Sequence, residues 1–140
     1  MQRVKIAIVL TMLIAASVSA GAQRVAVSKD EAQAWARYTV PLPKSMEIPA
    51  MVVVPKGAVA VTAPAGSDIV LGQACKELGE TFGPTDPSLS PTSLFRITLQ
   101  LGGSEAERLK SLKNSDQAYS ISTEADGNGL RLVALTPTGL

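Results

Sequence analysis

Six carboxylates are the first candidates for acid–base chemistry in this chain. They are Glu77, Glu80, Glu105, Glu107, Glu124 and Asp126. In most glycosidases two carboxylates flank the glycosidic bond, one acting as an acid and the other as a base or nucleophile. Here the six fall on expected helix surfaces, in an expected helix cap or beside an expected turn. Such positions predict solvated side chains, so we expect no catalytic residues in this chain.

Other chemistry-bearing residue types are absent or isolated. The chain has no histidine, which excludes Ser-His-Asp catalysis and histidine metal sites. Cys75 is the single cysteine, so it cannot form an internal disulfide or a cysteine zinc site, and its apolar helical surroundings favour a buried thiol. Asp126 and Asn128 mimic two calcium-loop positions, but Leu130 stands at the third. We therefore expect no metal and no cofactor.

Two short stretches could bind a ligand. Trp35 and Tyr38 could stack on a sugar, although two aromatics in a proline-flanked arm also fit a small apolar cluster. Gly66-Ser67 stands at a helix start, where anions bind, but it lacks phosphate-loop spacing. An aromatic content of 4% argues against an aromatic platform for carbohydrate.

Residues 1–22 have the composition of a signal peptide. Arg3 and Lys5 precede an apolar run and then small residues, with cleavage expected after Ala20 or Ala22. An uncleaved N-terminal anchor is the alternative. We expect an exported protein, periplasmic or extracellular, with no stable membrane span once the leader is removed. The 13 basic and 12 acidic residues form no basic block, so we expect no nucleic-acid partner.

The rest of the chain predicts short strands and two helices. Residues 23–40 form an arm, in which Ser28 and Glu31 could cap a helical turn. The clearest helix spans residues 67–82, where apolar residues recur at helical spacing between a Ser67 or Asp68 cap and Gly83. A second, shorter helix is predicted after the Ser104-x-x-Glu107 capping box. Strands are predicted at residues 51–54, 58–63 and 94–101.

The C-terminal stretch predicts a hairpin followed by a helix start. Residues 118–125 alternate as in a half-buried strand, with Tyr119, Ile121 and Thr123 on one side, and residues 130–135 return after an Asp-Gly-Asn-Gly turn. Thr136-Pro137 then predicts a helix N-terminus four residues before the last residue, which indicates a chain cut inside an element.

The element order is β-β-α-β-α-β-β. It predicts an α+β two-layer sandwich with a mixed, mostly antiparallel sheet and both helices on one face.

The C-terminal pattern resembles the end of the N-terminal, non-catalytic domain of family 20 glycoside hydrolases, the β-N-acetylhexosaminidases. The resemblance covers about residues 41–140 and includes a weak P-x-P match at Pro41-Leu42-Pro43. The strongest match comprises Tyr119, Ile121, Asp126-Gly127, Leu130, Leu132, Ala134, Thr136-Pro137 and Gly139-Leu140.

The resemblance implies an accessory domain that supports a catalytic (β/α)8 barrel missing from this chain. The barrel of the same parent polypeptide would be its partner and would carry the carbohydrate substrate, a glycan or chitin oligosaccharide with terminal N-acetylhexosamine. The family's catalytic aspartate–glutamate pair has no counterpart here, so the chain alone should be inactive. The alternatives are a secreted carbohydrate- or envelope-binding module, or the corresponding domain of an α-glucuronidase or α-N-acetylglucosaminidase. Without the barrel, we expect exposed apolar surface and self-association.

Overall fold

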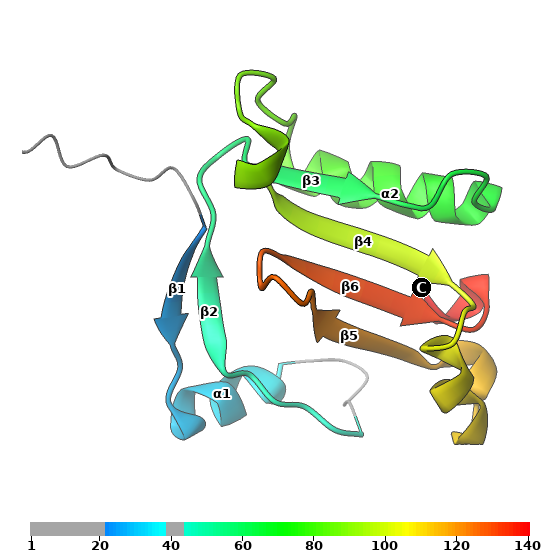
Figure 1. The fold of residues 1–140 in the computed structure, drawn as a ribbon. Helices are drawn as coiled ribbons and strands as arrows, with labels where there is room; N and C mark the ends of the chain where they lie inside the picture. Colours follow the sequence, from blue (N-terminus) through cyan, green and yellow to red (C-terminus); the bar gives the residue numbers. More distant parts are fainter. Residues whose placement is uncertain (1–21, 39–43) are drawn as a thin grey trace, which may run out of the picture.

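The computed structural model describes residues 22–38 and 44–140, and these combine helices with two sheets (Figure 1). The fold is therefore α+β, as the sequence predicts. Nearly all of the leader and the Pro41-Leu42-Pro43 segment lie outside the described residues. The elements are β1 (Gln23–Ala26), α1 (Lys29–Ala36), β2 (Ala50–Val53), β3 (Val59–Thr62), α2 (Ile69–Phe82), η1 (Pro91–Ser93), β4 (Phe95–Leu101), η2 (Ala106–Ser111), η3 (Ser115–Gln117), β5 (Tyr119–Thr123), β6 (Gly129–Ala134) and η4 (Pro137–Gly139).

The larger sheet has four strands in the order β3-β4-β6-β5. β3 and β4 are parallel, β4 and β6 are parallel, and only β5 and β6 are antiparallel. The prediction of a mostly antiparallel sheet is therefore wrong for these strands. A second, two-stranded sheet pairs β1 with β2 antiparallel, so the arm's first residues join the strand that begins at Ala50.

The connections explain the parallel pairs. α2 crosses over between β3 and β4, and a strand–helix–strand crossover returns the chain in the same direction. The chain then passes over one strand position to reach β5 at the sheet edge, and the hairpin brings β6 back between β5 and β4. The alternation of apolar and polar residues along a strand indicates only which side of that strand is buried, so it could not predict the order of the strands in the sheet.

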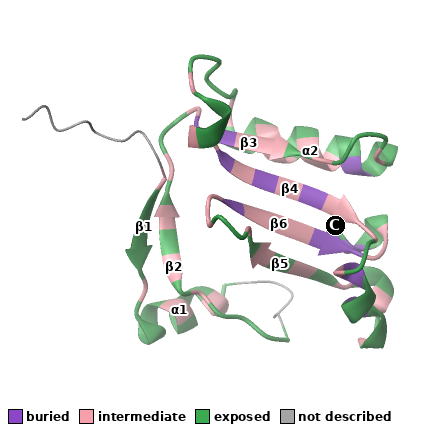
Figure 2. Ribbon diagram, in the orientation of Figure 1, coloured by how far each residue is buried: buried purple, intermediate pink, exposed green. Residues whose placement is uncertain are grey.

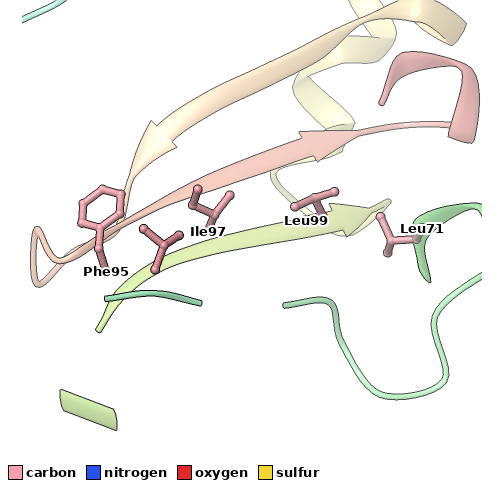
Figure 3. Packing of buried hydrophobic residues seen from close by; sticks show 5 residues of the cluster. Leu71, Phe95, Ile97 and Leu99 are labelled. Atoms are coloured by element: carbon pink, nitrogen blue, oxygen red, sulfur yellow. The ribbon is translucent and has the colours of Figure 1, made fainter. Parts of the chain in front are cut away.

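The sheet has one apolar face, which we define by Phe95, Ile97 and Leu99 of β4 (Figure 3). Leu71 of α2 joins the same core cluster. The strand register places further residues on this apolar face. They are Val59 and Val61 on β3, Leu101 on β4, Leu130, Leu132 and Ala134 on β6, and Tyr119, Ile121 and Thr123 on β5.

α2 lies over the apolar face, beside β3 and β4. Its first turn is capped by Asp68, whose carboxylate accepts a hydrogen bond from the Val70 N–H at 2.7 Å. Gly83 ends the helix at a φ of +77°, a conformation that favours glycine. The predicted helix is therefore confirmed, with Asp68 rather than Ser67 as its cap.

The second predicted helix occurs at the predicted place in the chain but is wrong in type, and the expectation that both helices cover one sheet face is wrong. Residues 106–111 form the 3₁₀ segment η2, with Glu105 before it and no side-chain cap. η2 packs on the opposite sheet face, where Ala106, Leu109 and Val133 are buried and the Glu105 carboxylate reaches Ser122. Its two buried apolar residues stand three apart, which fits one side of a 3₁₀ segment of 3.0 residues per turn.

The turn between β5 and β6 has the geometry that its sequence predicts. Gly127 has a φ of +71°, and the Asn128 N–H donates to the Asp126 carboxylate at 2.8 Å. The Asn128 side-chain amide donates to the Leu94 carbonyl at 2.9 Å, which ties the turn to the start of β4. A Cβ on Gly129 would lie 2.6 Å from the Arg96 carbonyl oxygen, so this close approach of β6 to β4 requires glycine.

Thr136-Pro137 begins a single 3₁₀ turn, η4, rather than an α-helix. The Thr136 hydroxyl makes no cap bond within η4 and instead donates to the Asp116 carbonyl, which holds η4 beside the segment before β5. Gly139 is buried there, and a Cβ on it would lie 2.7 Å from the Ala118 carbonyl oxygen.

Candidate functional site

The apolar face is covered over only half of its width. α2 and β2 pack against the β3–β4 half, where Phe95, Ile97 and Leu99 are at most 6% exposed. On the β5 side, Tyr119 is 42% exposed and Ile121 is 56% exposed. Figure 2 shows this difference as buried segments along β4 and a β5 without any. We call the exposed Tyr119 and Ile121, together with the partly buried Leu130 and Leu132 beside them, the open half-face.

α2 contributes a second exposed apolar surface. Leu71 is its one buried residue, whereas Ile69 is 87% exposed and Val70 is 47% exposed. A helix with this much uncovered apolar surface is typical of one that contacts another body.

A groove separates β2 from α2 on the apolar face. Its cavity volume is about 510 Å³, and most of its lining residues are apolar. Val52 and Val54 form one wall, Phe82 of α2 forms another, and the floor carries Phe95, Ile97 and Leu130. Lys56 is the one charged residue in the lining. The groove can therefore take an apolar group, and it offers no acid–base pair.

The opposite, polar face carries an ion-pair network at one end of the sheet. Arg96 donates to the Glu124 carboxylate at 2.9 Å and also bonds to Asp126, while the Thr98 hydroxyl donates to Glu124 at 3.0 Å. The Glu124 side chain is only 12% exposed. The prediction that Glu124 is solvated is therefore wrong, because β5 and β4 place it beside Arg96, a partner 28 residues away in the sequence.

The network shifts two pKa values. The pKa of Asp126 is lowered, first by the hydrogen bond from the Asn128 N–H and then by the bond from Arg96. The hydrogen bonds to Asp126 and then to Glu124 raise the pKa of the Arg96 guanidinium above its ordinary value. Both shifts favour the charged forms, as expected of an ion pair that fixes the hairpin to the sheet rather than of a proton-transfer group.

Glu105 forms a second polar cluster on the same face. Its carboxylate accepts from the Ser122 hydroxyl at 3.2 Å and lies 3.7 Å from the Arg131 guanidinium. The buried Ser120 hydroxyl has no hydrogen-bond partner among the described residues, and neither does Arg131 Nε. Glu107 instead pairs with the exposed Lys110.

The structure keeps the remaining sequence candidates apart. Glu77 accepts a hydrogen bond from Gln73 on the surface of α2, and Glu80 is exposed at the rim of a cavity between α2 and β3. Burial raises the pKa of the Cys75 thiol, which lies on the apolar side of α2. Trp35 lies in α1 and Tyr38 just beyond it, and Tyr38 is 85% exposed. Within residues 22–38 and 44–140, no three metal-ligand side chains come together.

The residues that sequence reasoning missed are those whose role depends on the fold. Arg96 and Thr98 look like the solvated side of an alternating strand, and nothing local predicts that Glu124 will face them. Val52 and Val54 belong to a predicted strand at residues 51–54, and nothing in that pattern places them in a groove wall. The tertiary arrangement decides both, and the one local signal was the alternation of residues 118–125, which indicates that one side of β5 is apolar.

No protein-family model, curated protein or solved structure matches this chain. Among the described residues, no helix is long and apolar enough to cross a membrane.

Proposed function

We propose that this chain is an exported accessory domain of a glycoside hydrolase. It supports a catalytic (β/α)8 barrel of the β-N-acetylhexosaminidase type, which acts on terminal N-acetylhexosamine in glycans or chitin oligosaccharides. The observation that carries this proposal is the open half-face. Four of the residues that carry the family resemblance, Tyr119, Ile121, Leu130 and Leu132, line it.

An accessory role fits the surfaces better than a catalytic one. The apolar face and the exposed side of α2 offer uncovered apolar area of the kind that a neighbouring domain buries. The carboxylates that come close to basic groups are already paired, Glu105, Glu124 and Asp126 with arginines and Glu107 with Lys110. The domain therefore contributes support, and the barrel contributes the substrate site.

Sequencing the transcript past the Leu140 codon tests this proposal. We expect an in-frame barrel that carries adjacent aspartate and glutamate residues. Unrelated sequence, or a stop codon with no barrel beyond it, would contradict the proposal.

Activity of the longer polypeptide separates the related families. Hydrolysis of 4-nitrophenyl N-acetyl-β-glucosaminide is expected for the proposed enzyme. Hydrolysis of the N-acetyl-α-glucosaminide or of an α-glucuronide in its place would assign the domain to one of the two alternative enzyme types. The purified 140-residue chain should hydrolyse none of the three substrates.

A further inference from the structure

The outer edge of β5 presents a row of unpaired backbone groups. The Glu124 N–H donates to the Gly129 carbonyl at 2.9 Å, which fixes the hydrogen-bonded pairs of the β5–β6 ladder. Because such pairs alternate in an antiparallel ladder, the N–H and C=O groups of Tyr119, Ile121 and Thr123 point away from β6. No described residue forms a hydrogen bond with them.

The two edges of the sheet differ in their protection. At the β3 edge, the Thr85 hydroxyl donates to the Val59 carbonyl at 2.8 Å, and the Asp86 N–H donates to the Gly57 carbonyl at 2.8 Å. β5 has the sequence Tyr-Ser-Ile-Ser-Thr, without a charge or a proline, and its register with β6 contains no bulge. Charges, prolines and bulges are the features that keep edge strands from pairing with other chains, and β5 lacks all three.

We propose that β5 pairs with β5 of a second copy of this chain, antiparallel, about a two-fold axis at Ile121. In this register Ile121 lies opposite Ile121 of the second copy, and Tyr119 lies opposite Thr123 of the second copy. The outward N–H and C=O groups of these three residues then bond to each other. Aromatic and β-branched pairs stabilise neighbouring strands, and a two-fold interface requires such self-complementarity.

Charge and surface continuity favour a second copy as the occupant. Glu124 and Asp126, the carboxylates that follow β5, already pair with Arg96, so the two-fold pairing places no unpaired like charges within the five-residue ladder. The pairing also extends the apolar face without a break, since Leu132 and Ile121 of one copy are followed by Ile121 and Leu132 of the other. One short strand per copy buries less than the roughly 1,200 Å² of a stable interface, so the dimer is weak and reversible.

A charge exchange at the two-fold axis tests this register. Ile121→Lys and Ile121→Glu each place like charges opposite each other, so each variant alone should remain monomeric at concentrations where the unmodified chain dimerises. An equimolar mixture places Lys opposite Glu and should restore dimers, which high salt then weakens. Sedimentation equilibrium across a concentration series measures all four samples.

Ile69→Lys is the matched control, because it removes an exposed isoleucine from α2 and leaves β5 intact. It should dimerise like the unmodified chain. An unmodified chain that stays monomeric at millimolar concentration would overturn the proposal. So would dimers that persist in Ile121→Lys, dimers that Ile69→Lys abolishes, or a mixture that stays monomeric. The proposal stands or falls independently of the glycosidase role.

Discussion

The two halves of the four-stranded sheet carry the same apolar alternation and differ in what covers it. On β4, alternate residues lie beneath α2 and β2, and Leu99 is 3% exposed. On β5, the residue in the equivalent place, Ile121, is 56% exposed. β4 and β5 each pair directly with β6, so the alternation of apolar residues along the two strands does not distinguish the covered half from the open one.

Because of this difference, the covered half stabilises the fold of the chain itself, whereas the open half-face is available for contact with another body. Burial removes apolar area from water at roughly 25 cal/mol per Å², so the covered half contributes to the stability of this chain by itself. The exposed Tyr119 and Ile121 of the open half-face gain that contribution only when another body covers them. Substitutions should therefore have unequal effects in the two halves, although the residue types are alike.

The largest effect is expected for Leu99→Ala in the covered half. Removing this buried side chain should lower the free energy of unfolding by about 2–5 kcal/mol. Ile121→Ala in the open half should lower it by less than about 1 kcal/mol, as is usual for an exposed position. Urea unfolding followed by circular dichroism gives both values. Equal losses at the two positions would show that the open half-face is covered in solution.

A smaller effect is expected on the polar face. Thr98→Val keeps the side-chain shape but removes the hydroxyl that donates to Glu124, and should cost about 1 kcal/mol of stability. Thr62 is the register partner of Thr98 on β3, is exposed and makes no side-chain hydrogen bond among the described residues, so Thr62→Val is the matched control. The control should change the urea midpoint little. A similar loss for both would remove the Thr98–Glu124 bond as the cause.

Acid should weaken the hairpin's attachment to the sheet. The folded-state pKa of Asp126 is lowered by the Asn128 N–H and by Arg96, so its contribution is present above the unfolded pKa, about 3.9, and is lost as pH falls through the folded pKa. Asp126→Asn keeps an acceptor for Asn128 but removes the charge. The variant should be slightly less stable at pH 6, and the two urea midpoints should converge as pH falls through the lowered folded-state pKa of Asp126. A constant difference across this range would contradict the charge argument.

The sequence predicted local features that depend on neighbouring residues. The Asp68-capped helix, the Asp126-Gly127 turn and the alternation of β4 and β5 were all readable, because capping, turn conformation and strand period involve residues a few positions apart. The 3₁₀ form of residues 106–111 was missed, because the Ser104-x-x-Glu107 pattern suggested a cap that this segment does not use.

Strand order and the partners of the charged groups could not be predicted in this way. The β4–β6 parallel pair joins residues 33 positions apart, such as Ile97 and Leu130, and no local pattern specifies that pairing. The Arg96–Glu124 bond follows from the same order. The candidate surfaces are therefore tertiary properties, and the sequence indicated only that the strand of residues 118–125 is half-buried, with Tyr119 and Ile121 on one side.

The smallest expected effect is on the rate at which a thiol is alkylated, measured with the thiol first in the covered half and then on the open half-face. Burial raises the pKa of the Cys75 thiol, so less thiolate is present at neutral pH. The reagent must also reach a partly buried residue on the side of α2 that packs on the sheet. Alkylation of the folded chain by iodoacetamide should therefore be slower than alkylation of the chain in urea. In the double variant Cys75→Ser, Ile121→Cys, the thiol lies on the open half-face, and at protein concentrations too low for pairing its folded and unfolded rates should be nearly equal. If Cys75 reacts as fast in the folded chain as in urea, α2 does not stay packed on the sheet. The β3–β4 half of the apolar face would then be no better covered than the open half-face.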